Sequence, residues 1–583
     1  MDIFSLIMVA GGLAFFLYGM NIMSTGLERM AGGKLEKLLK SMTDNVFKSL
    51  LLGAGITIAI QSSSATTVML VGLVNSGIMT IEQSVGIIMG SNVGTTLTAW
   101  LLSLVGLESS NMFLKLLKPE NFSLIFALIG ILLIMTSKKQ KKKSIGSILI
   151  GFAILMYGMK LMSDAVAPLA DMPEFAQVLT AFRNPLIGVL IGALVTGIIQ
   201  SSAASVGILQ ALALTGTITY GMAIPIIMGQ NIGTCVTSLI SSIGVNKNAK
   251  KVSVVHISFN LIGTVVFMII YSVCRGLLEV SLLESPINSF GIAVVHSIFN
   301  IGTTVILVPF NKLLVLIADF VIPGNGEDEE STIILDERLL ATPSIAISEA
   351  NSAAAEMARI AKSEIIRALD IMVKYDEDKA EEIVHLENRL DSYEDAVGSY
   401  MVKLNGTQLS ESDSLESNKI LYAIGDFERL GDHGVNIMYS IRKAYEANLE
   451  FTDDAKEEIA VLVDAVKEIV YLATQAYIGN NIETAICVEP LEQVIDNIVF
   501  SMKSRHMVRL KEGKCSIDMG FILQDILLNC SRISDHCSNI AAAVIEIYER
   551  HSYDTHKYLN TVKSGDKIFD NLFEDYSEKY SIE

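Results

Sequence analysis

The sequence predicts an all-α fold: a polytopic membrane protein with two inverted repeats, each containing a re-entrant helical hairpin, followed by a soluble helical bundle domain. Three observations support this fold class. Residues 1–322 are apolar with a net charge of +6, whereas the remaining 261 of the 583 residues carry −25. The first part matches itself after a shift of 139 residues. Each copy places a polar block inside an apolar run, where hydroxyl and amide groups are costly to bury.

These features divide the chain into five parts. We expect membrane repeat 1 at 1–139, membrane repeat 2 with a final span at 140–322, an acidic linker at 323–343, a helical domain at 344–560 and a C-terminal tail at 561–583.

The first polar block, Gln61-Ser62-Ser63-Ser64, lies between the apolar runs 50–60 and 65–74. Each run is about 11 residues, or roughly 17 Å of helix, which is about half of a hydrocarbon core. We therefore expect the chain to enter to mid-depth, turn and leave on the same side. The block Gln200-Ser201-Ser202-Ala203 predicts a second hairpin at about 184–216.

The repeat is specific. Windows 53–101 and 192–240 share 20 identities in 49 positions without a gap, and the identities include Gln, Asn and Thr. Two halves with polar interruptions at matching positions are typical of secondary transporters.

Lysine clusters orient the predicted spans, because basic loops favour the cytoplasmic side. The first span, at 3–24, is expected to be retained rather than cleaved as a signal peptide. The clusters comprise Lys34, Lys37, Lys40 and Lys48; Lys138, Lys139, Lys141, Lys142 and Lys143; and Lys247, Lys250 and Lys251. If all three are cytoplasmic, the protein is a multi-pass cell-membrane protein with its N-terminus outside. Spans at about 80–105, 121–137, 219–243 and 288–320 then place the acidic domain in the cytoplasm.

We expect the hairpin tips to meet near the bilayer midplane and form a site for substrate and coupling ion. Glycines beside Asn92 and Asn231 suggest spans that are locally unwound. The candidate residues are Gln61, Ser62, Ser63, Ser64, Thr66, Thr67, Asn92, Thr95, Gln200, Ser201, Ser202, Ser205, Asn231 and Thr234.

This set of groups suits an oxyanion and Na⁺. Helix N-termini and hydroxyls favour the anion, and neutral oxygens favour the cation. Coupling to Na⁺ is preferred over protons, because Glu82 is the only acid between residues 45 and 107 and lies in a predicted helix start, Thr80-x-x-Gln83. The alternative is that these Ser and Thr residues serve only helix packing.

The paired Gln-Ser-Ser motifs resemble those of the type II sodium/phosphate cotransporter family, over about residues 1–320. The resemblance implies inorganic phosphate as substrate and Na⁺ as coupling ion, with both motifs at the binding sites. Ala203 departs from it, since the first motif has Ser64 there. The pattern His-x-x-Phe-Asn at 256–260 and 296–300 is interpreted as helix-to-helix hydrogen bonding, with a metal pair as the alternative.

The acidic half contains its own repeat, which predicts two three-helix bundles. Glu428 and Asp432 are four residues apart, on one helix face. They could join Glu387 or Asp391 in a metal cluster, or form a buried network with Arg429. This region resembles the PhoU family, whose Glu-x-x-x-Asp motifs hold metal clusters. The resemblance implies a divalent or transition metal at Glu428 and Asp432 and a regulatory role. Ser531 departs from the motif in the second bundle.

The leading prediction is a sodium-coupled inorganic phosphate symporter working by alternating access in the lipid bilayer. The alternatives are a sodium/dicarboxylate carrier and a phosphate-sensing scaffold. A homodimer is also considered. The charge disfavours nucleic acid as a partner, and no nucleophile–base set, P-loop or dinucleotide motif indicates an enzyme.

Overall fold

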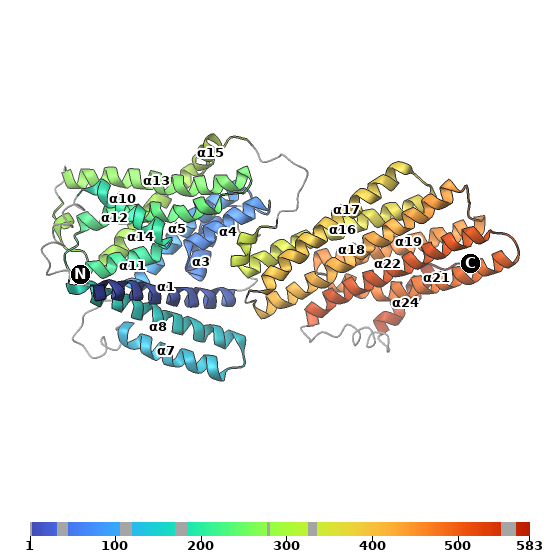
Figure 1. Ribbon diagram of the computed structural model, residues 1–583, viewed down its shortest axis with the longest axis horizontal. Coiled ribbons are helices and arrows are strands. Elements are labelled where there is room, and N and C mark those ends of the chain that lie inside the picture. The colour runs from blue at the N-terminus through green and yellow to red at the C-terminus, as the bar shows by residue number, and fades with distance from the viewer. Residues whose placement is uncertain are drawn as a thin grey trace. The chain divides into compact units, whose positions relative to one another are not determined.

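The computed structural model describes residues 3–31, 45–104, 119–168, 184–276, 280–324, 335–407, 409–549 and 567–582. Within these ranges the regular elements are helices (Figure 1). The chain divides into two compact units, one formed by residues 1–330, 336–346 and 409–411 and the other by the rest.

The N-terminal unit contains six helices that are long and apolar enough to cross a membrane, among the described residues. Its α-helices are α1 (Ile3–Ala31), α3 (Val46–Ile60), α4 (Ser63–Asn75), α5 (Ile81–Ser103), α7 (Pro119–Thr136), α8 (Gln140–Val166), α10 (Pro185–Ile199), α11 (Ser202–Ala213), α12 (Tyr220–Ser241), α13 (Lys247–Gly276), α14 (Ser289–Leu307) and α15 (Asn311–Val321). The prediction of a polytopic all-α protein is confirmed. Lys34, Lys37 and Lys40 lie outside the described residues.

Helices α3 and α4 form a helical hairpin. In one continuous helix Thr57 and Thr66 would be about 13 Å apart along the axis, but their Oγ1 atoms are 3.1 Å apart. The second copy repeats this contact, with Thr196 Oγ1 2.7 Å from Ser205 Oγ between α10 and α11. Both chain reversals therefore occur at the polar blocks.

The bases of the two hairpins lie at opposite ends of α12. Asn75, the last residue of α4, accepts a hydrogen bond from the backbone of Asn246, which follows the C-terminal end of α12. Helix α11 instead leads into Tyr220, the first residue of α12. The 22 residues of α12 span about 33 Å. The two hairpins therefore start from opposite ends of α12. The predicted inverted repeats require this arrangement.

Glycines allow the first arm of each hairpin to touch the following long helix backbone to backbone. A Cβ atom on Gly90 of α5 would lie 2.0 Å from the carbonyl oxygen of Leu50 in α3. In the second copy, a Cβ on Gly229 would lie 2.0 Å from the oxygen of Val189. Small residues spaced four apart bring membrane helices this close.

These glycines correct one prediction. Helices α5 and α12 continue through Asn92 and Asn231 instead of unwinding there. Each Asn donates its Nδ2 hydrogen to the carbonyl four residues earlier, at 2.9 and 2.8 Å. The glycines beside them therefore provide close packing, not free carbonyls.

The final predicted span, 288–320, coincides with one of these six apolar spans, Ser289–Val321, but its helix is interrupted. It breaks at a 3₁₀ turn, Val308–Phe310, into α14 and α15. Pro309 explains the break, because proline has no N–H to donate to the preceding turn. Helix α15 returns to α13 through an ion pair of 2.7 Å between Asp319 and the buried Lys251.

Helix α14 packs on α5 through Trp100, the single tryptophan of the chain. Its Nε1 donates to Ser297 Oγ at 2.9 Å, and its ring meets Phe290 edge-on at 5.2 Å. The start of α5 is as predicted, since Thr80 and Gln83 form a capping box.

Among its described residues, the C-terminal region has six long helices in two successive sets of three. They are α16 (Pro343–Val373), α17 (Glu377–Asn405) and α18 (Glu411–Glu446), then α19 (Asp453–Gly479), α21 (Val488–Lys511) and α22 (Ile517–Glu549), with the short α20 (Ile482–Ile486) between α19 and α21. The segment predicted as a tail contains α24 (Lys567–Lys579), which packs against α21. The segment predicted as a linker contains a 3₁₀ helix, η4 (Glu337–Ala341), which belongs to the N-terminal unit; 325–334 lies outside the described residues.

We expect Gly90→Ala to disrupt the N-terminal unit, because its Cβ would overlap a backbone oxygen. Overpacking of this kind costs about 1–3 kcal/mol. The measurement is the yield of monodisperse protein after detergent extraction, together with its melting temperature. Gly55→Ala is the matched control, since nothing lies within 4 Å of its Cβ position. Equal behaviour of the two variants would contradict the packing role.

Candidate functional site

Each hairpin tip consists of a glutamine whose backbone is in the left-handed conformation, followed by a serine that caps the next helix. Gln61 has φ 56° and Gln200 has φ 57°, an uncommon conformation for a residue with a side chain. The Ser62 hydroxyl then accepts the N–H of Ala65 at 3.1 Å, and the Ser201 hydroxyl accepts that of Ala204 at 3.2 Å. Serine is a favoured N-cap, so the Gln-Ser sequence ends one helix and begins the next.

The two tips share a cavity of about 130 Å³, and every side chain that lines it is uncharged. Eight predicted site residues line it: Gln61, Ser62, Ser63, Ser64, Thr95, Gln200, Ser201 and Ser202. Sequence reasoning missed four others: Met20, Thr57, Thr98 and Ala203. The repeat could have indicated two of them, because Thr57 and Thr98 are identical to Thr196 and Thr237 in the second copy.

The other six predicted residues do not line this cavity but stabilise the helices around it. Thr66 and Ser205 each form a hydrogen bond between the two arms of their hairpin, as described above. Thr67 and Thr234 donate to the carbonyls of Ser63 and Gln230, at 2.8 and 2.9 Å. Asn92 and Asn231 bond within their own helices.

The two tips are not equivalent. Gln61 is 8% exposed; its Oε1 accepts a hydrogen bond from Thr98 at 3.1 Å, and its Nε2 donates to the Ile58 carbonyl at 2.7 Å. Gln200 is exposed, and Ala203 lies in the cavity wall at the position that corresponds to Ser64. The first tip is therefore more firmly held and carries one more hydroxyl.

The His-x-x-Phe-Asn pattern makes helix-to-helix bonds in its first copy. His256 Nδ1 lies 3.2 Å from Ser238 Oγ, and Asn260 Nδ2 donates to Cys235 Sγ at 3.3 Å, which joins α13 to α12. In the second copy, His296 Nδ1 is buried without a partner among the described residues. The prediction is confirmed for the first copy only.

In the C-terminal unit a buried acid lies among the predicted metal-binding acids. Glu364 of α16 is 0% exposed, and neither of its carboxylate oxygens has a hydrogen-bond partner within the described ranges. Burial, and then the charges of Glu387, Asp432 and Asp391, raise its pKa to about 9. Glu364 is therefore protonated and neutral at pH 7.

The acids predicted to bind a metal lie close enough for their charges to interact. Burial and the neighbouring charges of Asp432, Asp391 and Glu394 raise the pKa of Glu428. Within the described residues, no group of three His, Cys, Asp or Glu side chains is placed to hold a metal ion. His433 bonds instead to Asn529 of α22, at 2.8 Å from its Nδ1. The metal at Glu428 and Asp432 stays a prediction.

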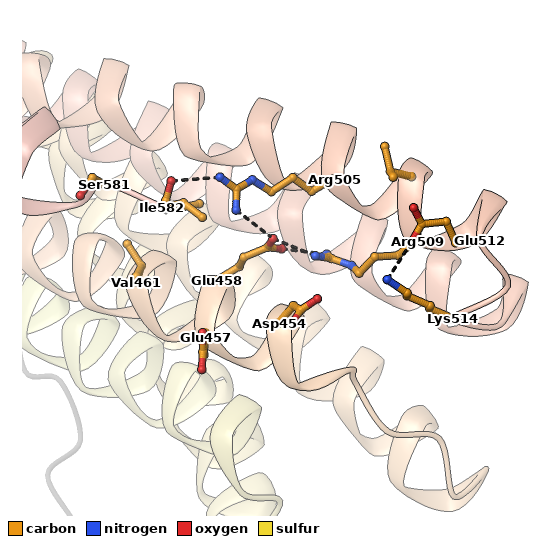
Figure 2. A pocket seen from close by; sticks show the side chains of 11 residues that line it. Asp454, Glu457, Glu458, Val461, Arg505, Arg509, Glu512, Lys514, Ser581 and Ile582 are labelled. Atoms are coloured by element: carbon orange, nitrogen blue, oxygen red, sulfur yellow. Dashed lines mark hydrogen bonds and ion pairs between the residues drawn. The ribbon is translucent and has the colours of Figure 1, made fainter.

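A larger cavity of about 630 Å³ lies between α19, α21 and the end of the chain (Figure 2). Arg509 forms two hydrogen bonds to the Glu458 carboxylate, at 2.8 and 2.7 Å, and Arg505 donates to the backbone oxygen of Ile582 at 3.0 Å. Figure 2 shows both arginines turned to these partners. Both guanidinium groups are thus hydrogen-bonded within the protein, and we interpret the cavity as structural.

Paired hairpins whose broken tips share an uncharged cavity are typical of secondary transporters. The Na⁺/Pi-cotransporter family model matches residues 15–164 and 154–296, once per repeat, and the PhoU domain model matches 354–441 and 459–544. Residues 15–296 thus belong to the Na⁺/Pi-cotransporter family, and the chain carries a PhoU region on its C-terminal side.

Relatives cover both parts of the chain. The putative inorganic phosphate export protein YjbB of Escherichia coli (strain K12) is 22% identical over 552 residues, 93% of this chain and 98% of that protein. YqeW of Bacillus subtilis (strain 168) is 29% identical over 313 residues, 54% of this chain and 96% of that protein. Human sodium-dependent phosphate transport protein 2B is 32% identical over 111 residues, 18% of this chain and 16% of that protein. The structure of PhoU from Streptococcus pneumoniae aligns with a TM-score of 0.32 at 17% identity, over 36% of this chain and 99% of that one.

We expect the stability of the C-terminal unit to fall as the pH rises, in part through Glu364. The folded state keeps a proton that an unfolded carboxyl, with a pKa near 4.5, releases. This contribution is fully present below pH 4.5 and is lost as the pH rises towards 9, with a limiting slope of about 1.4 kcal/mol per pH unit. Glu364→Gln keeps a neutral group there and should flatten the dependence.

The measurement is calorimetric unfolding of the detergent-solubilised full chain from pH 5 to 9. Glu450→Gln is the control, because its side chain is 85% exposed. If Glu364→Gln keeps the wild-type slope, Glu364 does not hold the proton.

Proposed function

We propose that this protein is a sodium-coupled inorganic phosphate symporter that works by alternating access. The observation that carries the proposal is the uncharged cavity lined by both Gln-Ser-Ser tips. The names of the relatives, one for phosphate export and one for sodium-dependent phosphate transport, agree with the substrate and the ion.

Phosphate would bind between two helix N-termini. Helix α4 begins at Ser63 and α11 at Ser202, and the first N–H groups of a helix have no partner within it. Their partial positive charge favours an anion. The hydroxyls of Ser63, Ser64 and Ser202 would add donors, so the site needs no arginine or lysine.

Sodium would bind to the neutral oxygens beside the anion. The Gln61 amide oxygen and the hydroxyls of Thr95 and Thr98 line the same cavity. An oxygen-lined site between discontinuous helices suits Na⁺, and the charge of the ion would offset that of phosphate. Glu82 is exposed in the first turn of α5, which does not favour it as a proton carrier.

The size of the cavity supports phosphate over the rival substrate class. Its volume of about 130 Å³ equals that of roughly four water molecules. This suits the five heavy atoms of phosphate better than the eight of a four-carbon dicarboxylate. No arginine lines the cavity to pair with carboxylates.

We further propose that the N-terminus is outside and that the PhoU region is cytoplasmic and regulates transport. The basic loops support this orientation. Lys247 and Lys250 lie at the start of α13, beside the base of the first hairpin, whose tip lines the cavity.

We expect purified protein in liposomes to take up labelled phosphate when a Na⁺ gradient is imposed. Replacing Na⁺ by K⁺ should abolish the uptake, and excess unlabelled phosphate should compete while succinate should not. Uptake indifferent to Na⁺ would contradict the coupling, and competition by succinate would favour the dicarboxylate carrier. A scaffold would show no uptake at all.

Ser62→Ala and Gln61→Ala should each reduce this uptake at least tenfold in protein that remains inserted and monodisperse. Ser62→Ala also removes a helix cap, at a cost of about 1 kcal/mol. The matched control is therefore Asn45→Ala, which removes the cap of α3. The Asn45 side chain accepts the Phe47 N–H at 2.8 Å, and Asn45 does not line the cavity. Wild-type uptake by both tip variants would place the site elsewhere.

A further inference from the structure

The segment that leads into the PhoU region is seated on the second helix of the first hairpin. We call residues 336–342 the latch; it contains η4 and packs against α4. Leu339 of the latch is 0% exposed and lies over Gly72. A Cβ atom on Gly72 would come within 2.7 Å of Leu339 Cδ2 and 2.9 Å of Cγ, so only glycine leaves room for the Leu339 side chain. We call this contact of Leu339 with Gly72 the seat.

A polar cluster anchors the latch beside Leu339. Asn75, at the end of α4, donates its Nδ2 hydrogen to Asp336 Oδ2 at 3.0 Å, and Asp336 is 5% exposed. Asn246, between α12 and α13, donates its backbone N–H and its Nδ2 to Asn75 at 3.0 and 2.9 Å. Arg338 pairs with Asp336 at 3.2 Å and reaches the Ile243 carbonyl at 3.3 Å. The first hairpin, the α12–α13 loop and the latch are thus one hydrogen-bonded assembly.

The second hairpin provides an internal comparison. The residues that correspond to Gly72 and Asn75 after the shift of 139 are Ala211 and Leu214. Glycine costs a helix about 1 kcal/mol relative to alanine. The repeat shows that the hairpin itself needs neither Gly nor Asn at these positions. Gly72 is instead explained by the latch, and Asn75 by its bonds to the latch and to Asn246.

The latch is also the covalent entry to the PhoU region, since α16 begins at Pro343, directly after Thr342. Thr342 is buried, and its N–H donates to the Leu339 carbonyl at 2.8 Å. A change that pulls on α16 therefore acts on Leu339 and Asp336 through a few ordered residues.

We infer that the latch couples the PhoU region to transport: seated, it restrains the first hairpin, and unseated, it lets that hairpin move and accelerates the transport cycle. The inference rests on the proposed function, because the hairpin it restrains carries the transport site. A restraint that binds one conformation of a two-state element shifts its population by its differential stability.

The test uses the full chain in three variants. Leu339→Ala empties the seat, Gly72→Ala fills it, and Gly55→Ala is the matched control on the other arm of the same hairpin. Hydrogen–deuterium exchange reports on residues 63–79 and 336–346, and the initial rate of Na⁺-driven phosphate uptake reports on transport. We expect the two seat variants to lose protection in both segments and to raise the uptake rate about fivefold or more, within the range usual for coupled sites. Gly55→Ala should change neither.

The results separate the inference from the proposed function. Loss of protection with unchanged or reduced uptake would overturn the coupling, since the latch would then be only structural. Unchanged protection in both seat variants would overturn the latch itself. If wild-type protein transports no phosphate, the proposed function fails, and the exchange measurement still decides whether Leu339 and Gly72 hold the hairpin.

Discussion

The site depends on backbone contact between the first arm of each hairpin and the long helix that follows it. A helix that ends in the middle of an apolar layer exposes polar groups there, and it needs neighbouring protein to cover it. Gly53 and Gly90 in the first copy, and Gly192 and Gly229 in the second, bring the helices close enough to do so. Any side chain larger than hydrogen at these contacts would separate the arm from its support.

Because this contact supports the arms of each hairpin, the residues at the tips are available to line the cavity. Hydroxyl pairs between the arms, such as Thr57 with Thr66, satisfy polar groups just below each tip. The left-handed glutamine ends one helix, and the serine cap begins the next at the cavity wall. The same short sequence thus provides the turn, the helix N-terminus and the hydroxyls, which explains why it occurs twice.

The hairpins and the duplication could be predicted because Gln and Ser interrupt apolar runs at matching positions. The predicted unwinding at Asn92 and Asn231 is wrong, because a glycine beside a polar residue is compatible with close packing as well as with a break in the helix. The turn within the last span depends on Pro309, and the mean hydropathy of the whole span does not reveal a single proline. The latch was missed because the acidic run at 327–330 dominates its surroundings, and one leucine on one glycine leaves no periodic pattern. Glu364 was missed because a single acid in an amphipathic helix gives no sign that it is buried.

The position of Trp100 has a practical consequence for spectroscopy. The chain has a single indole, two residues beyond Thr98 in the cavity wall, and it hydrogen-bonds to Ser297 on α14. Its emission wavelength responds to polarity and to that hydrogen bond. The unlabelled protein therefore contains its own optical reporter for rearrangement between α5 and α14 during turnover, with no background from any other tryptophan.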